Sequence, residues 1–199
     1  MPAGESAETE PSTGGAAPDL TDAANVLVLS ERLDSAARAT YVDDLVASGL
    51  ANLLVVSFTE DPARWLDAWG TVDERPGTTV LVQESAPEAA DPPGVERVAE
   101  EPADLTGLGI TVSERLTNWQ RSESLLMFES LNTLLAHIEL KRVFRFLHVL
   151  VNRVKSTGAT AHYHLDPSAH EDRTVATLTS LFDTVVAHEE GRWQETTWP

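Results

Sequence analysis

The sequence predicts an α/β fold with a doubly wound, mostly parallel sheet between two layers of helices, three layers in all. Two observations carry this prediction. Short apolar runs that suit strands buried on both faces alternate with segments whose apolar residues recur at helical spacing. Glycine or proline stands at several of the boundaries between them. Such alternation indicates crossover connections between parallel strands.

The first half of the chain contains three expected strands separated by helices. The strands are the apolar runs 26–30, 52–58 and 78–83. Residues 33–48 place apolar side chains at helical spacing and are followed by a glycine, which predicts a helix and its end. Residues 61–69 begin with Asp-Pro and carry two tryptophans, which predicts a short helix because proline is favoured in a first turn.

The second half begins with an acid- and proline-rich stretch, 84–104, which predicts a loop that contains a short strand near 95–98. A helix is expected around 108–119, where apolar residues share one helical face. The remaining expected elements are strand 125–130, helix 137–157, strand 159–164, helix 171–182 and strand 184–189, followed by a hairpin through Gly191 to Trp193.

We expect one domain with short appendages. Residues 1–24 lack periodicity, which predicts a disordered, acidic N-terminal segment, called the lead below. Residues 25–193 are expected to form the domain, and residues 194–199 a C-terminal tail. The lead has neither the basic nor the apolar region of a signal peptide, and no apolar run approaches the ~20 residues of a membrane span. Cysteine is absent, which excludes disulfides and cysteine-ligated metals. These features predict a cytoplasmic protein without a membrane partner.

The charge balance is strongly acidic. The chain has 32 Asp and Glu against 14 Lys and Arg, a net charge of −18, and its two lysines are Lys141 and Lys155. This composition resembles that of extreme halophiles, in which dense counterions screen the self-repulsion of the folded chain. We therefore interpret the charge as a solvent adaptation; a disordered acidic tail or a binder of basic partners is the alternative. The acidity argues against general nucleic-acid binding, which needs a basic face.

One expected helix is basic. Within 139–155 it holds five cations against a single acid, Glu139; the cations are Lys141, Arg142, Arg145, Arg153 and Lys155. Two interpretations remain open. The cations form a solvated face that pairs with nearby acids, or they form a docking strip for an acidic partner or a second copy of the chain.

Ligands of parallel sheets bind at the carboxyl ends of the strands. Here those ends are Ser30-Glu31, Ser57 to Thr59, Gln83-Glu84, Glu129-Ser130 and Asp166. Any site is expected to come from these residues. None of the serines lies in the Gly-x-Ser-x-Gly turn of a hydrolase nucleophile, so the sequence gives no support to that chemistry.

Residues 125–131 (LLMFESL) resemble the Walker B strand of the RecA/KaiC-like ATPases, with Glu129 and Ser130 at the positions of the family's Asp-Ser. Residues 144–167 resemble the helix, glycine, Thr-rich strand and loop that follow, and residues 178–186 the later helix and strand. Residues 104–116 resemble a helix entry of haloarchaeal relatives. The resemblance implies a RecA-like P-loop NTPase core in a haloarchaeal protein.

The chain departs from that family after its first strand. A phosphate-binding loop needs glycines, a lysine for the phosphates and a Ser or Thr for Mg²⁺. Residues 30–36 read SERLDSA, without glycine or lysine, and place Glu31 and Asp34 where phosphate would sit. We therefore expect no bound nucleotide and no ATPase activity. The preferred hypothesis is a non-catalytic RecA/KaiC-like domain that acts as a regulatory or interaction module with a protein partner or a second copy.

The alternative hypothesis is a metal-dependent enzyme. Strand alternation places His162, His164 and Asp166 on one face, with His170 beyond, and imidazoles with a carboxylate suit a zinc-like divalent ion. The competing interpretation is that the histidines fill polar niches under a helix and at a subunit contact. Glu129 likewise either holds a metal ion or hydrogen-bonds the N-terminus of a neighbouring helix.

Overall fold

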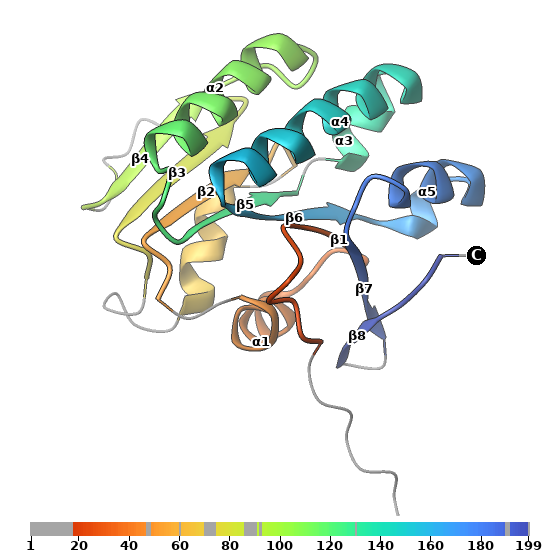
Figure 1. Ribbon diagram of the computed structural model, residues 1–199, viewed down its shortest axis with the longest axis horizontal. Coiled ribbons are helices and arrows are strands. Elements are labelled where there is room, and N and C mark those ends of the chain that lie inside the picture. The colour runs from red at the N-terminus through yellow and green to blue at the C-terminus, as the bar shows by residue number, and fades with distance from the viewer. Residues whose placement is uncertain are drawn as a thin grey trace, which may run out of the picture.

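The computed structural model describes residues 18–46, 49–59, 61–69, 75–85, 91, 93–129, 131–189 and 192–198. At its centre is an eight-stranded sheet with the strand order β4-β3-β2-β5-β6-β1-β7-β8. Helices cover both faces of this sheet (Figure 1). The predicted three-layer, doubly wound α/β fold is therefore confirmed.

Every neighbouring pair of strands is parallel except β7 and β8, which form an antiparallel hairpin. The strands are β1 (Asn25–Leu29), β2 (Asn52–Val56), β3 (Thr78–Gln83), β4 (Val95–Ala99), β5 (Ser124–Phe128), β6 (Thr160–Leu165), β7 (Thr184–Glu189) and β8 (Arg192–Glu195). From β1 the chain crosses to β2, builds outward to β4, and returns through β5 and β6. It then passes β1 and forms β7 and β8 on its other side, so the direction of winding reverses at β4.

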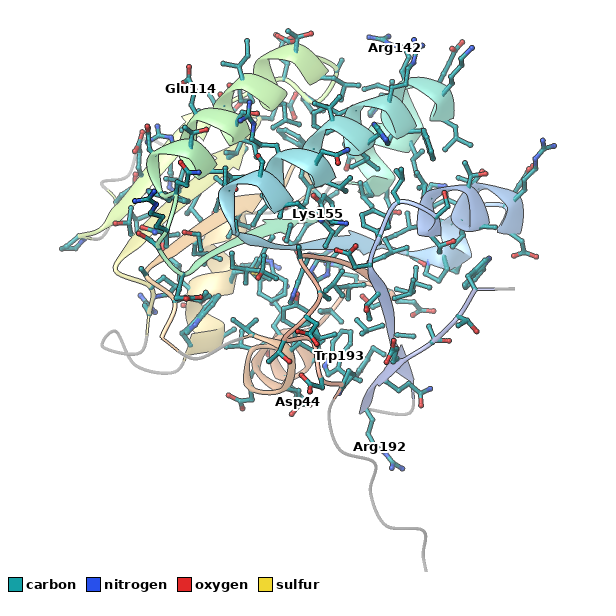
Figure 2. The ribbon with its side chains drawn as sticks, viewed as in Figure 1. Asp44, Glu114, Arg142, Lys155, Arg192 and Trp193 are labelled. Atoms are coloured by element: carbon teal, nitrogen blue, oxygen red, sulfur yellow. The ribbon has the colours of Figure 1, made fainter. Side chains whose placement is uncertain are left out.

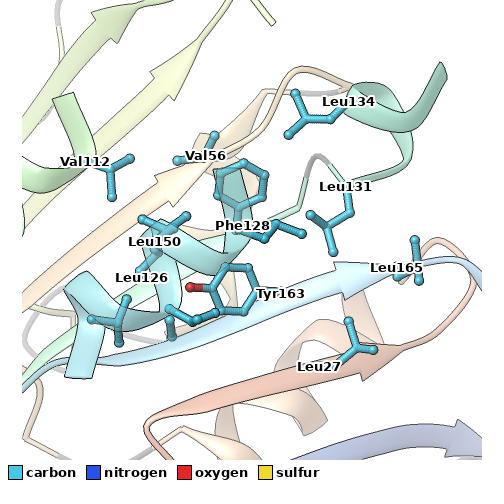
Figure 3. Packing of buried hydrophobic residues seen from close by; sticks show 14 of the residues in the cluster. Leu27, Val56, Val112, Leu126, Phe128, Leu131, Leu134, Leu150, Tyr163 and Leu165 are labelled. Carbon is cyan, nitrogen blue, oxygen red and sulfur yellow. The ribbon is translucent and has the colours of Figure 1, made fainter. Parts of the chain in front are cut away.

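Four helices cover one face of the sheet: α2 (Leu105–Asn118), α3 (Leu131–His137), α4 (Leu140–Thr157) and α5 (Asp172–Thr179). Figure 3 shows the cluster between them and the sheet, in which Phe128 and Tyr163 of neighbouring strands lie close to Leu150 of α4. These three side chains are almost fully buried. Burial of a large apolar side chain contributes about 1.5–3 kcal/mol, so this cluster, which has more buried members than the one on the other face, contributes the larger share of that burial energy.

The opposite face carries α1 (Ser35–Leu45) and the 3₁₀ helix η1 (Pro62–Trp69). The cluster beneath them contains Val26 and Val28, whereas Leu27 between them points into the first cluster. Successive residues of a strand face opposite sides, so a strand covered on both faces, such as β1 or β2, is apolar along most of its length. This explains why the strands appear in the sequence as continuous apolar runs.

The helix ends follow from local hydrogen bonding. At the start of α1 the carboxylate of Asp34 accepts a hydrogen bond from the backbone N–H of Ala37 at 2.8 Å. Asp104 does the same for α2, from the N–H groups of Thr106 and Gly107. Both are N-caps, which satisfy amides that a helix leaves without partners.

Besides small shifts at several element ends, three differences from the expectation change the description of the chain. Helix 137–157 is preceded by a separate helix, α3, because the backbone of Glu139 is extended (φ −56°, ψ 136°) and breaks the helical run. The last strand, β8, ends at Glu195, two residues beyond the expected end of the domain. At the other end, Leu20 and Ala23 of the expected lead pack against the second cluster. The packed part of the chain therefore begins before Asn25.

Among the described residues, no helix has both the length and the apolar character needed to span a bilayer.

Gly158 ends α4 in the left-handed conformation, with φ +74°. We expect Gly158→Ala to lower the free energy of unfolding by about 1 kcal/mol, because a Cβ strains this conformation even where space is available. Denaturant unfolding in molar KCl measures the change. The matched control is Gly109→Ala in the interior of α2, where the added methyl would meet Phe146 at an ordinary 3.5 Å and stability is expected to stay equal or rise. An equal loss of unfolding free energy in both variants would contradict the view that the left-handed backbone of Gly158 requires glycine.

Candidate functional site

A cleft of about 290 Å³ lies at the carboxyl ends of β1, β5 and β6. These three strands are adjacent in the sheet, so the loops that follow them meet at one edge. The residues that line this carboxyl-edge cleft are Ser30, Glu31, Arg32, Leu33, Thr59, Glu129, Asn132, His164, Leu165 and Asp166. The cleft therefore gathers several of the residues that the sequence placed at strand ends, and it brings Glu31 together with Glu129.

The cleft is rich in carboxylates. Glu31, Glu129 and Asp166 line it, with Arg32 as the single cation among the described lining residues. Glu129 is held by its backbone N–H, which donates to the carbonyl of Val56 at 2.9 Å, and its Oε2 is shielded from solvent. Ser130, which the resemblance pairs with Glu129, lies outside the described residues.

His162 lies deeper than the cleft, under α1. Its Nδ1 forms a hydrogen bond with the hydroxyl of Tyr41, and both side chains are buried. Burial lowers the pKa of His162 to about 4. Burial, followed by the negative charge of Glu129, raises the pKa of Tyr41 well above its usual value. The pair is therefore neutral at neutral pH and acts as a satisfied polar contact within the second apolar cluster.

His164 is the histidine that reaches the carboxyl-edge cleft. Its side chain is 8% exposed, and its ring packs against Tyr41 at 5.2 Å and Trp65 at 5.6 Å between ring centres. Burial, with a smaller effect of the neighbouring His162, lowers the pKa of His164 to about 3. Its Nε2 is buried and has no hydrogen-bond partner among the described residues.

Asp166 and His170 have local structural roles. The Oδ1 atom of Asp166 accepts hydrogen bonds from the backbone N–H and the hydroxyl of Ser168, at 2.9 and 2.7 Å, and so starts the short turn η3 (Pro167–Ala169). Nε2 of His170 lies 2.9 Å from Oδ1 of Asn132, which also accepts from the backbone N–H of Asp166 at 3.3 Å. Asn132 thus ties the loop after β6 to the first turn of α3.

The four predicted metal ligands are therefore divided among different environments. His164 and Asp166 share the cleft, His162 is bonded to Tyr41, and His170 is bonded to Asn132. No group of three or more His, Cys, Asp or Glu suited to a metal ion occurs within the part of the chain that the structure describes. The geometry favours the interpretation of the histidines as polar residues under a helix. The metal site stays a prediction that elemental analysis of protein purified without chelator would test.

Sequence reasoning missed most of the neighbours that define these environments. Tyr41 is one of the residues at helical spacing in the expected helix 33–48, yet its ring contacts Trp65, Trp193 and both histidines. Asn132 lies in α3, a helix that the sequence did not predict. A signal for Tyr41 existed, since a buried tyrosine needs a partner for its hydroxyl, but nothing in the sequence identified His162 as that partner.

The comparisons with known proteins identify a family. A model of a "Family of unknown function (DUF7504)" matches residues 23–188. The chain belongs to this family. The matched region runs from just before β1 into β7, so it includes every strand that borders the cleft and leaves β8 outside. No curated protein matches the chain.

A solved structure from Pyrococcus horikoshii OT3, titled only as a structural study, is similar in fold. The two chains share 10% sequence identity with a TM-score of 0.59, over 87% of this chain and 85% of the other. At this identity the similarity concerns the fold alone.

The two buried histidines make stability depend on pH. Each has a lower pKa in the folded protein than the ordinary 6.5, so the unfolded chain binds the extra proton. The stability that the neutral histidines provide is fully present above pH 6.5, and the free energy of unfolding decreases as the pH falls from 6.5 toward 4. We expect each histidine to add about 1.4 kcal/mol per pH unit to the slope of the unfolding free energy in this range.

The His164→Gln variant should therefore lose one such increment of slope between pH 6.5 and 5, measured by denaturant unfolding at fixed salt. His148→Gln on α4 is the control, because that side chain is exposed in the folded protein. An unchanged slope in the His164 variant would show that this ring is not held neutral.

Proposed function

We propose that this chain is a non-catalytic domain, related to the RecA/KaiC-like ATPases, that acts as a regulatory or protein-interaction module in a halophilic cytoplasm and does not hydrolyse nucleotides. The observation that carries the proposal is the cap of α1. The N–H groups at the start of the helix that follows β1 would be the natural anion site of a parallel α/β sheet. Here the carboxylate of Asp34 already accepts from one of them, Ala37, at 2.8 Å.

The cleft beside this helix adds to the argument. Phosphoryl transfer depends on groups that stabilise negative charge on the phosphates. The described walls of the carboxyl-edge cleft instead contain Glu31, Glu129 and Asp166 against Arg32. A triphosphate in this cleft would face more negative than positive charge, which opposes its binding.

The sheet arrangement supports the relationship to nucleotide-handling proteins. β1 and β5 lie on either side of β6, so the loop after β1 and the acid at the end of β5 border the same cleft. In P-loop NTPases an acid and the Ser or Thr of the phosphate loop hold the Mg²⁺ of the nucleotide together, so the two have to border the same cleft. Glu129 keeps that position, while the loop after β1 lacks the groups that bind phosphate.

Titration calorimetry with Mg-ATP in molar KCl, together with a phosphate-release assay, tests the proposal. We expect neither heat of binding nor release of phosphate, because the anion site is capped from within the chain. Clear affinity or turnover would overturn the proposal.

A charge variant tests the physical reason. Glu31→Lys with Asp34→Ser replaces both acids and keeps a residue that caps α1, and we expect a measurable gain in affinity for Mg-ATP. The control is Asp104→Ser, which makes the same change of cap on α2, away from the cleft. If the double variant gains nothing, these two acids are not what closes the site to phosphate.

A further inference from the structure

A second hollow lies on the outer layer, on residues that do not line the carboxyl-edge cleft. A groove of about 770 Å³ runs between α2 and α4. Its lining residues are Leu105, Thr106, Gly109, Ile110, Ser113, Glu114, Arg142, Arg145, Phe146, Val149, Leu150 and Arg153. We call it the α2/α4 groove. Figure 1 shows the two helices side by side on the same face of the sheet.

The groove holds the exposed apolar surface of the molecule. Ile110 on α2 is 54% exposed and Val149 on α4 is 67% exposed, and they are the two large apolar side chains that are strongly exposed in the described part of the chain. Both line the groove, together with the partly buried ring of Phe146. At Gly109 the floor carries no side chain, so the space above Phe146 stays open. Apolar residues gathered in one hollow mark a binding surface.

The same groove holds three arginines that form no ion pair with any residue the structure describes. Arg142, Arg145 and Arg153 are exposed along one stripe of α4, and none of them takes part in the ion pairs found among the described residues. By contrast, Arg115 of α2 is paired with Glu96. Figure 2 shows Arg142 pointing outward from this layer. In a chain of net charge −18, three unpaired cations beside an apolar strip indicate a surface complementary to an acidic partner.

We propose that the α2/α4 groove binds an amphipathic helical segment of a partner protein, with its apolar stripe on Ile110 and Val149 and its flanking Asp or Glu on the arginines. The inference rests on the proposed function, since it names the partner chemistry of an interaction module. A helix laid into a groove between two helices buries its apolar stripe and leaves its polar face in water. Glu114 is the one acid of the lining, so the groove prefers an acidic over a basic segment.

A second copy of the chain fits the groove less well. Pairing two grooves around a two-fold axis presents the same surface to itself. The groove of the second copy would offer the three arginines of the first only one acid of its own lining, Glu114, and both copies carry a net charge of −18. Charge complementarity therefore selects an acidic segment of a different protein.

Two synthetic peptides of the length of α2 test the proposal. Both carry leucines at positions i, i+3, i+4 and i+7, one with flanking glutamates and the other with flanking lysines. Fluorescence anisotropy with the full chain, in molar and in lower KCl, measures their binding. We expect the glutamate peptide to bind at least ~10-fold more tightly than the lysine peptide, and more weakly as salt rises.

Variants then locate the site. Val149→Glu should weaken binding of the glutamate peptide by at least ~10-fold, since it places a charge in the apolar strip. The triple change of Arg142, Arg145 and Arg153 to Glu should reverse the preference between the two peptides. Arg173→Glu on α5 is the matched control, an exposed arginine outside the groove, and should leave binding unchanged. Thermal unfolding checks that each variant is folded.

Equal affinity for the two peptides, or binding that Val149→Glu leaves unaltered, would overturn the proposal. Dimerisation in sedimentation experiments that Val149→Glu abolishes would also overturn it and would assign the groove to a second copy. The Mg-ATP titration separates this inference from the proposed function. If the chain binds neither peptide and also fails to bind ATP, the inference about the groove is wrong and the proposed function stands. If the chain hydrolyses ATP, the proposed function is wrong, whether or not the peptides bind.

Discussion

The structure depends on the burial of its central strands on both faces. Residues 26–29 of β1 and 53–56 of β2 are fully or almost fully shielded from solvent. Apolar side chains of these strands point to both sides of the sheet, so helices have to cover both of its faces. Two surfaces follow from this arrangement. The carboxyl-edge cleft lies where the strands end, and the α2/α4 groove lies between two helices of one layer.

The same constraint governs the polar groups inside. A histidine on a doubly buried strand must be neutral or paired, because a charged imidazole in an apolar layer is costly. His162 meets this condition through Tyr41, and the rings of Trp65 and Trp193 close the layer around that tyrosine. A spacing that resembles a metal motif in the sequence thus becomes part of the packing. The His-x-His spacing correctly predicts that both histidines lie on one face of the strand. It does not reveal which residues of other elements pack on that face.

What the sequence could predict follows from the same physics. Strands buried on both faces leave continuous apolar runs, so the strands, the sheet class and the edge that holds the cleft were all predictable. The break between α3 and α4 was not, because Ile138 beside it is as buried as the core residues of a continuous helix. The roles of Asn132 and Tyr41 were also hidden, since their partners lie 38 and 121 residues away in the chain. Contacts of that separation are set by tertiary packing, to which local patterns are blind.

The two surfaces differ in how their charges are satisfied, and this difference is the basis for assigning them opposite roles. At the cleft, the carboxylate of Asp166 accepts from the backbone N–H of Ser168, and beside the cleft that of Asp34 accepts from the N–H of Ala37. At the groove, Arg142 and Arg153 extend from α4 beside apolar side chains and are compensated by none of the described acids. In a chain with 18 more acids than bases, pairing each arginine within the molecule would have been easy. Cations left uncompensated next to exposed Val149 are therefore better explained by a partner than by the stability of the fold.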